Sequence, residues 1–385
     1  MTSYFALDLG TTKFCLAMCQ NERKVDLCQL PAGGIKKGML ADFAAAKWVL
    51  MELLETAEKK FSTRIKSVAV GITGNHLRYY RAEASIKING EKIAVGTLNS
   101  LQERVKSEKP DREILHVIPL RYRIDAREWL RKPLGFRGQQ LEAEFFVIDS
   151  DRFYLEDVMS LCNDSGLEVS KFVAESIASS GVTLTETEKE MGVALIDIGG
   201  GSSDGIVFID GIPQHSFSIA TAGNLITQDL SYGLHISKQD AELVKQHFGL
   251  MTSDLMKPLS LYDLSQSKKQ INWRDVYPVL APRIDEFVGL LEEELAPFHR
   301  MLRAGVALTG GGAQLPELAS YIKSYLHLNA FKIVPKISMD IGDSFNLKYA
   351  TVLGLLHSCV VGAQPHAESS TYLRAFINWL RELSH

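Results

Sequence analysis

One stretch of the sequence decides the fold: ALIDIGGGSSDGIVFIDG, at residues 194–211. The apolar run over 193–198 predicts a buried strand, and it ends where consecutive glycines allow a tight turn. An acidic side chain precedes the glycines and hydroxyl side chains follow them. This segment is called loop 2, and its members are Asp197, Gly199, Gly200, Gly201, Ser202 and Ser203.

The N-terminus repeats this arrangement. The apolar run YFALDL at 4–9 also ends in an acid, a glycine and hydroxyls. This segment is called loop 1, and its members are Asp8, Gly10, Thr11, Thr12 and Lys13. Further strand-like sequence follows each loop, at 14–19 and 25–30 and at 206–209 and 215–220. The echo predicts two similar halves that face a shared cleft.

A third glycine run lies between a strand and a helix. The run GVALT at 305–309 predicts the strand, and a helical pattern covers 315–326. This segment is called loop 3, and it contains Gly310, Gly311 and Gly312. Bare backbone at this point could let a flat base and a ribose lie against the chain.

The chemistry of the loops favours a magnesium nucleotide. Glycine lets backbone N–H groups approach an anion, the hydroxyls add donors, and Lys13 supplies a charge suited to phosphate oxygens. Two carboxylates, Asp8 and Asp197, would repel a polyphosphate unless a divalent cation lay between them. Mg²⁺ keeps several waters and uses few carboxylates, so we expect both acids to hold it largely through water. The alternative is that each acid merely caps a turn.

Composition narrows the class of protein. A chain of 385 residues suits two or more domains, and a formal net charge of -4 argues against a nucleic-acid partner. Five cysteines without a CxxC pair predict reduced, core-filling thiols and a cytosolic protein. We find no signal peptide and no apolar run of about 18 residues, so any contact with a membrane would be peripheral.

The sequence changes character near residue 82. Residues 82–150 are more charged and carry short strand-like runs at 84–88, 114–119 and 144–148, which indicates an inserted small α/β unit. Elsewhere we expect helices at 44–60, 152–161 and 174–185, strands at 65–72 and 167–173, and a mainly helical region at 226–300.

The three loops together resemble those of the actin superfamily of ATPases, and longer segments resemble its FtsA family. These segments are HVIPLRYRID (116–125), loop 2 with its strands, TAGNLITQDL (221–230), ISKQDAELVKQHFG (236–249), VALTGGGAQLPEL (306–318) and YATVLGLLH (349–357). The resemblance implies an α/β, actin-like (ribonuclease H-like) two-domain ATPase fold with an inserted small α/β subdomain, and ATP with Mg²⁺ as its ligands.

The same resemblance suggests a division of the chain. The expected parts are a first core of 1–81 plus 151–189, an inserted subdomain of 82–150, a second core of 190–225 plus 301–358, a helical subdomain of 226–300, a linker of 359–370 and a terminal helix of 371–385.

Further site residues follow from the resemblance alone. Gly223 and Asn224 join the nucleotide site, and Glu242 and Lys245 would reach the ribose or base. An exposed i,i+3 pair on a helix is the alternative for the last two. Glu175, with Asp197, is a candidate catalytic residue that would orient the attacking water, although a solvated helix-surface glutamate is the alternative. Such proteins are at most slow ATPases.

The C-terminal segment SSTYLRAFINWLRELSH predicts an amphipathic helix at 371–385. Its apolar side chains fall within an arc of about 160° when placed on a helix. They are Tyr372, Leu373, Phe376, Ile377, Trp379, Leu380 and Leu383. A helix docked on its own core or on a partner is the alternative. The resemblance, and the polar linker before it, favour binding to a membrane through apolar burial, because Arg374 and Arg381 are nearly offset by acidic groups.

The resemblance to the FtsA family implies a cytoplasmic cell-division protein. It would polymerise with ATP on the inner face of the cytoplasmic membrane and tether the tubulin-like FtsZ at the division site during septum formation. The alternatives are an actin-like adaptor of another envelope machine, such as the PilM component of type IV pili, and a small-molecule kinase. No acceptor-binding motif supports the kinase.

Overall fold

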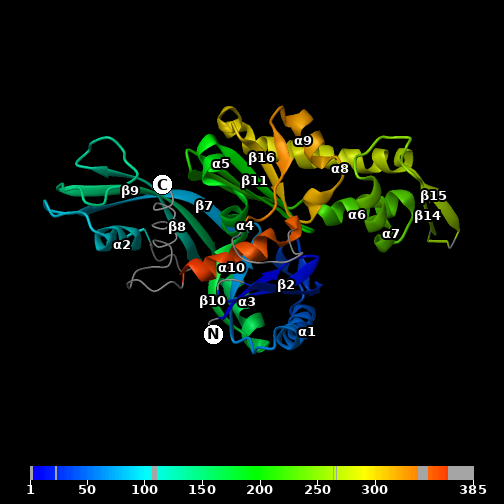
Figure 1. The fold of residues 1–385 in the computed structure, drawn as a ribbon, viewed down its shortest axis with the longest axis horizontal. Helices are drawn as coiled ribbons and strands as arrows, with labels where there is room; N and C mark the ends of the chain where they lie inside the picture. The colour runs from blue at the N-terminus through cyan, green and yellow to red at the C-terminus, as the bar shows by residue number, and fades with distance from the viewer. Residues whose placement is uncertain are drawn as a thin grey trace.

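The computed structural model describes residues 3–21, 24–105, 111–262, 264–265, 267–336 and 346–362. Figure 1 shows two central sheets, with a separate three-stranded sheet at one end and a helical region at the other.

The first sheet has the strand order β10-β6-β1-β2-β3. Its strands are β1 (Ser3–Leu9), β2 (Lys13–Gln20), β3 (Lys24–Pro31), β6 (Ser67–Ile72) and β10 (Glu168–Ala174). Strands β1 to β3 form an antiparallel meander, whereas β6 and β10 continue the sheet in parallel from β1. This meander was predicted from the alternation of short apolar runs and turns.

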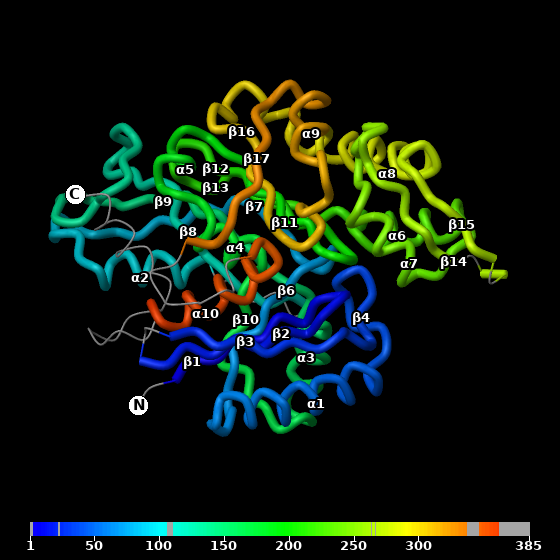
Figure 2. The backbone as a smooth tube through the Cα atoms, turned by 45° about the vertical axis from the view of Figure 1, so that its right-hand side comes forward, coloured from blue at the N-terminus to red at the C-terminus, as the bar shows by residue number. Residues whose placement is uncertain are grey.

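Helices cover both faces of the first sheet (Figure 2). Side chains of α1 (Phe43–Phe61) and α3 (Arg152–Asp164) share one core with β1 and β2, including Leu7, Leu50 and Leu155. The other face packs against α4 (Glu175–Thr183) and α10 (Ala350–Gly362). Asp42 caps α1 as expected, since its side chain accepts from the Ala45 amide at 3.0 Å.

The second sheet repeats the first. Its order is β13-β12-β11-β16-β17, with an antiparallel meander followed by two parallel neighbours. Its strands are β11 (Val193–Ile198), β12 (Ser203–Ile209), β13 (Ile212–Ile219), β16 (Gly305–Thr309) and β17 (Ala330–Lys332). The predicted pair of similar halves is therefore confirmed at the level of strand order.

Four longer helices belong to the second half: α6 (Gly223–Leu234), α7 (Lys238–Phe248), α8 (Trp273–Leu295) and α9 (Leu318–Leu326). They share one core with β11 and β16. The region 226–300 is mainly helical, as expected, but a hairpin of β14 (Leu259–Tyr262) and β15 (Lys268–Ile271) interrupts it. Outside the inserted domain, the other described elements are β4 (Ile35–Lys36), β5 (Met39–Leu40), α5 (Glu186–Met191) and the 3-10 turns Ala296–Met301, Gly312–Gln314 and Leu347–Tyr349.

The inserted domain has its own sheet and core. Its elements are β7 (Leu77–Lys87), α2 (Val95–Glu103), β8 (Arg112–Ile124) and β9 (Gln140–Asp151), in the strand order β7-β9-β8. The strands are longer than the runs predicted from sequence, and β7 begins before residue 82. Charged side chains on one face hid this length, because Glu144 accepts from both Arg81 and Arg121 across the sheet.

Helix α10, the last described helix, packs on the first half of the molecule and not on the second half, where the sequence had placed it. The division by sequence put residues up to 358 with the second core, but α10 packs on the first sheet and on α4. The two helices touch closely at Gly354, where a Cβ would lie 2.0 Å from the Ala178 carbonyl oxygen. Residues 359–362, expected in a linker, form the last turn of α10.

The predicted membrane helix at 371–385 lies outside the described residues. Among the helices that the structure describes, none combines the length and apolar character needed to cross a bilayer. The cysteines all fall within the described ranges as free thiols, and Cys15, Cys19, Cys28 and Cys162 are buried.

The α4–α10 contact yields a test of the fold. Gly354→Ala should lower the free energy of unfolding by about 1–3 kcal/mol, because the new methyl group meets backbone. Gly181→Ala, in the exposed part of α4, has open space and should instead raise it by about 0.5–1 kcal/mol. Urea unfolding of both variants measures the two changes. Equal effects would contradict this packing.

Candidate functional site

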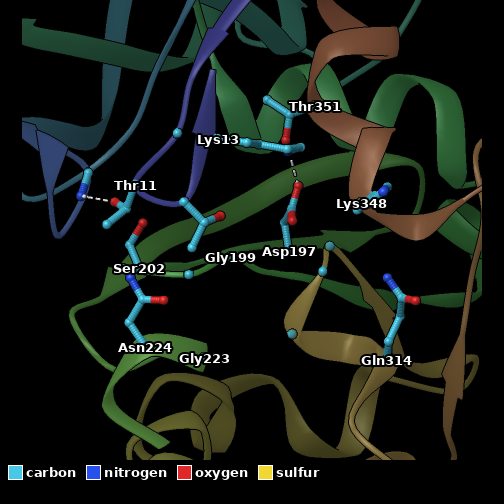
Figure 3. Close-up of a pocket in the computed structure, with 18 of the residues that line it drawn as sticks. Thr11, Lys13, Asp197, Gly199, Ser202, Gly223, Asn224, Gln314, Lys348 and Thr351 are labelled. Atoms are coloured by element: carbon cyan, nitrogen blue, oxygen red, sulfur yellow. Dashed lines mark hydrogen bonds between the residues drawn. The ribbon is translucent and has the colours of Figure 1, made fainter. Parts of the chain in front are cut away.

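The two halves enclose a cleft of about 760 Å³. Figure 3 shows that loops from both halves point into it. Its lining contains every predicted nucleotide-site residue except Ser203. It also contains residues that were not predicted: Gly38, Thr73, Asp204, Ile226, Gln246, Gln314, Leu315, Asn346, Lys348 and Thr351.

Loops 1 and 2 meet directly across the cleft. A Cβ on Gly200 would lie 2.2 Å from the Thr12 methyl carbon, and one on Gly201 would lie 2.4 Å from the Thr11 hydroxyl oxygen. That hydroxyl oxygen also accepts a hydrogen bond from the Gly38 amide at 3.1 Å. Glycine is therefore required in loop 2, because any side chain would push the two halves apart.

Loop 3 packs against the end of β11. Gly310 has a φ of +85°, and a Cβ there would lie 2.3 Å from the Asp197 carboxylate oxygen. Gly312 is equally confined, since its Cβ would lie 2.5 Å from the Ile198 side chain. Gly311 differs, because the nearest atom to its Cβ position is the Lys348 Cβ at 3.8 Å. Two glycines thus allow the loops to pack, and the third leaves bare backbone beside the cleft.

Acidic side chains converge between the loops. Asp8, Glu175, Asp197 and Asp204 all line the cleft, and they come from β1, α4, β11 and β12. Burial raises the pKa of Asp197 to about 7, and the charges of Asp204 and Asp8 add to this rise. Thr351 opposes it by donating to the Asp197 carboxylate at 2.9 Å. Burial and the same acids also raise the pKa of Glu175 well above its usual range.

Lys13 forms an ion pair with one of these acids among the described residues of the cleft. Its ammonium lies 3.4 Å from the Asp8 carboxylate. Burial would lower the pKa of Lys13, but the charge of Asp8, aided by Asp197, outweighs burial and raises it. One lysine leaves most of the carboxylate charge uncompensated, and this surplus fits a divalent cation. Although these acids share the cleft, no three acidic, histidine or cysteine groups among the described residues are arranged to hold a metal ion by themselves, so phosphate and water would supply other ligands.

Glu242 and Lys245 border the cleft from α7. The Lys245 ammonium donates to Glu242 at 2.6 Å and to the Gly223 carbonyl oxygen at 3.2 Å, while the Thr227 hydroxyl donates to Glu242 at 2.6 Å. Glu242 and Lys245 thus form an i,i+3 ion pair on α7, which was the alternative to a role at the ligand. They also line the cleft, where the resemblance would place them. The network fixes α7 to the start of α6.

Ser203 departs from the prediction. It begins β12 and is fully buried, and its hydroxyl donates to the Thr221 carbonyl oxygen at 2.8 Å. Alternation along the strand explains this, because Ser202 faces the cleft and its neighbour must face away. The same alternation turns Asp204 toward the cleft, a signal that the sequence contained and that was overlooked. Thr351, another lining residue that was not predicted, lies within the segment 349–357 that carries the family resemblance.

Two family models match the chain. The model for "Cell division protein FtsA" matches residues 194–354, and the "SHS2 domain inserted in FTSA" matches residues 74–149. The FtsA of Neisseria meningitidis serogroup B is 28% identical over 367 residues, covering 91% of this chain and 89% of that protein. The FtsA of Escherichia coli K12 is 26% identical over 380 residues, covering 91% and 90%.

Solved structures share the fold. One in a "PilM-PilN type IV pilus biogenesis complex" has a TM-score of 0.67 at 18% identity, covering 94% of this chain and 99% of that one. MreB5 of Spiroplasma citri bound to ADP has a TM-score of 0.58 at 15% identity, covering 92% and 95%. The predicted actin-like fold with an inserted α/β domain is confirmed.

Crowding of Asp197 predicts a pH-dependent stability in the absence of ligand. Below about pH 4, Asp197 is protonated in both the folded and the unfolded protein and does not lower the free energy of unfolding. Above pH 7 it is ionised in both, and the unfavourable burial of its charge then lowers the free energy of unfolding fully. Asp197→Asn should therefore raise the free energy of unfolding at pH 8, on the order of 3 kcal/mol, and change it little at pH 4.

Thr351→Val is the companion variant, because it removes the donor that lowers the pKa of Asp197. The loss of stability should still begin near pH 4 but should extend to higher pH and become larger, because only the folded pKa rises. Urea titrations across pH 4–8 measure both effects. The crowding is refuted if Asp197→Asn is no more stable than the wild type at pH 8.

Proposed function

This chain belongs to the FtsA family of cell division proteins, and we propose that it binds Mg-ATP in the cleft, polymerises on the inner face of the cytoplasmic membrane and tethers FtsZ filaments at the division site. The observation that carries the proposal is the meeting of three glycine loops from both halves around a surplus of carboxylates.

The cleft residues divide between the parts of the nucleotide. Loops 1 and 2 would hold the phosphates through backbone amides, hydroxyls and Lys13, with Asp8 and Asp197 holding Mg²⁺ through water. Loop 3, with Glu242 and Lys245, would hold the base and ribose. When bound, Mg²⁺ supplies positive charge that neutralises the phosphate oxygens. MreB5, which shares the fold, is bound to ADP in its solved structure, and this supports an adenine nucleotide as the ligand.

Glu175 would orient water at the phosphate end of the cleft. Its carboxyl faces Asp8, Asp204 and Asp197, and its raised pKa makes it a better proton acceptor than an ordinary glutamate. The remaining cleft residues bind and orient rather than transfer protons. We expect slow turnover at most, with nucleotide-dependent assembly as the main consequence of binding.

Assembly and tethering would use surfaces away from the cleft. The inserted domain, which has its own core, would contact the next protomer in a filament. The helical region would bind FtsZ, and its exposed apolar side chains support this role. They are Tyr232, Leu243, Leu255, Tyr262 and Leu264.

A PilM-like adaptor is the second candidate, and the TM-score of 0.67 favours it. That likeness extends to the fold only, at 18% identity. Relatives at 26–28% identity over 91% of the chain favour the division protein. The amphipathic sequence at 371–385 also favours the division protein, since it would hold a filament on a membrane.

Gly311 provides a direct test of the nucleotide site. Gly311→Val should weaken Mg-ATP binding at least about tenfold, because the new side chain would occupy the face on which the base lies. It should not change stability, since φ there is -63° and no atom lies within 3.8 Å of the new Cβ. Calorimetry and urea unfolding measure the two properties.

Gly96→Val in α2 is the matched control, because that position also has open space and lies in the inserted domain. It should bind Mg-ATP like the wild type. Unchanged affinity in Gly311→Val would remove loop 3 from the site.

The membrane helix can be tested with paired charge changes. Phe376→Glu should abolish pelleting with liposomes, because a carboxylate would enter the acyl boundary. Arg374→Ala should weaken pelleting much less, since the segment has almost no net charge. The opposite ranking of the two variants would mean that electrostatic attraction, rather than apolar burial, drives binding.

A further inference from the structure

The inserted domain touches the first half at the place where β10 turns into α4. Strand β10 is an edge strand of the first sheet, and β8 of the inserted domain lies against it (Figure 2). All but the last residue of the segment HVIPLRYRID at 116–125 belong to β8, and its first residue, His116, is buried at this junction. The nucleotide site described above does not use this segment.

His116 accepts a hydrogen bond from the backbone of the first half. The Ala174 amide donates to its Nε2 atom at 2.9 Å. Ala174 is the last residue of β10 and the residue before α4, and Glu175 follows it directly in the cleft. We propose that His116 is a positioning residue for Glu175, through which the inserted domain sets the place of an acidic side chain in the nucleotide cleft.

The chemistry of the junction suits a neutral imidazole. Burial lowers the pKa of His116 to about 3, and the charge of Lys171 on β10 contributes to this. The ring therefore stays neutral at ordinary pH, and its Nε2 lone pair is available to the Ala174 amide. A leucine of similar size would leave this amide, on the outer edge of the sheet, without its acceptor.

Glu175 has little freedom to compensate for a shift of its backbone. A Cβ on Gly71 would lie 2.9 Å from its carboxylate oxygen, so β6 confines it on one side. On the other sides it faces Asp8 from β1, Asp197 from β11, Asp204 from β12 and Lys13 from β2. A displacement at Ala174 would therefore change the charges that the Glu175 carboxyl meets.

The inserted domain also contacts the second half. Arg81 on β7 donates to Gln214 on β13, and Arg131 donates to the Asp210 carbonyl oxygen at the turn between β12 and β13. The domain thus spans both halves, and a force on it from a neighbouring protomer would reach Glu175 through His116. This inference deepens the proposed function and rests on it for any effect on ATP.

A double-mutant cycle without nucleotide tests the connection. Full-length His116→Leu, Glu175→Gln and the double variant are unfolded in urea at pH 7.5. The effects on the unfolding equilibrium constant should depart from additivity by at least about threefold. Without the His116 acceptor the Glu175 side chain moves away from its acidic neighbours, so removing its charge has a smaller effect. Additive effects would overturn the proposal.

Two controls keep this result specific. His116→Gln retains an acceptor oxygen for the Ala174 amide, so its cycle with Glu175→Gln should be close to additive. Glu168→Gln, an exposed acid at the start of β10, should be additive with His116→Leu. Equal coupling of His116 to both acids would indicate a general structural effect and overturn the proposal.

ATP turnover gives a second readout. In His116→Leu the rate constant kcat for phosphate release should fall about tenfold, whereas Kd for Mg-ATP stays within about threefold. A loss of affinity with unchanged kcat would contradict a role at Glu175. If the wild type binds no Mg-ATP, the proposed function fails, and the nucleotide-free cycle still decides whether His116 positions Glu175.

Discussion

Close packing against the bare backbone of the glycine loops is the constraint on which this structure depends. Loop 2 lies so close to Thr11 and Thr12 that a Cβ on Gly200 or Gly201 would collide with them. Loop 3 lies equally close to Asp197. Because the glycines of loops 2 and 3 place no side chain in the way, the ends of β1, β11 and β16 meet at one cleft. Any ligand there contacts both halves at once, so its binding is linked to their relative placement.

The same close approach crowds negative charge. Burial and mutual repulsion raise the pKa of Asp197 to about 7, and that of Glu175 also rises. Lys13 offsets only part of this charge. The arrangement costs stability without a ligand, and the proposed cation with its bound phosphates would offset that cost. Stability and ligand binding are therefore opposed at the cleft, as is common at functional sites.

Much of the fold and the cleft was predictable, because local patterns encode them. The two meanders and loops 1 to 3 follow from apolar runs that end in glycine, and these loops hold most of the predicted site. The position of α10 was not predictable, since its nearly all-apolar sequence suits either half and only the small Gly354 allows contact with α4. The length of β7 was missed because cross-strand ion pairs resemble a charged loop in sequence. His116 was missed because its role depends on packing between two domains.

Hydrogen exchange with and without Mg²⁺ and a non-hydrolysable ATP analogue tests the central claim most directly. The account predicts that amides of loops 1, 2 and 3 become protected together, because one ligand bridges both halves. The exposed face of the inserted domain should exchange as before. Protection confined to one half, or absent from all three loops at saturating analogue, would contradict a nucleotide held between them.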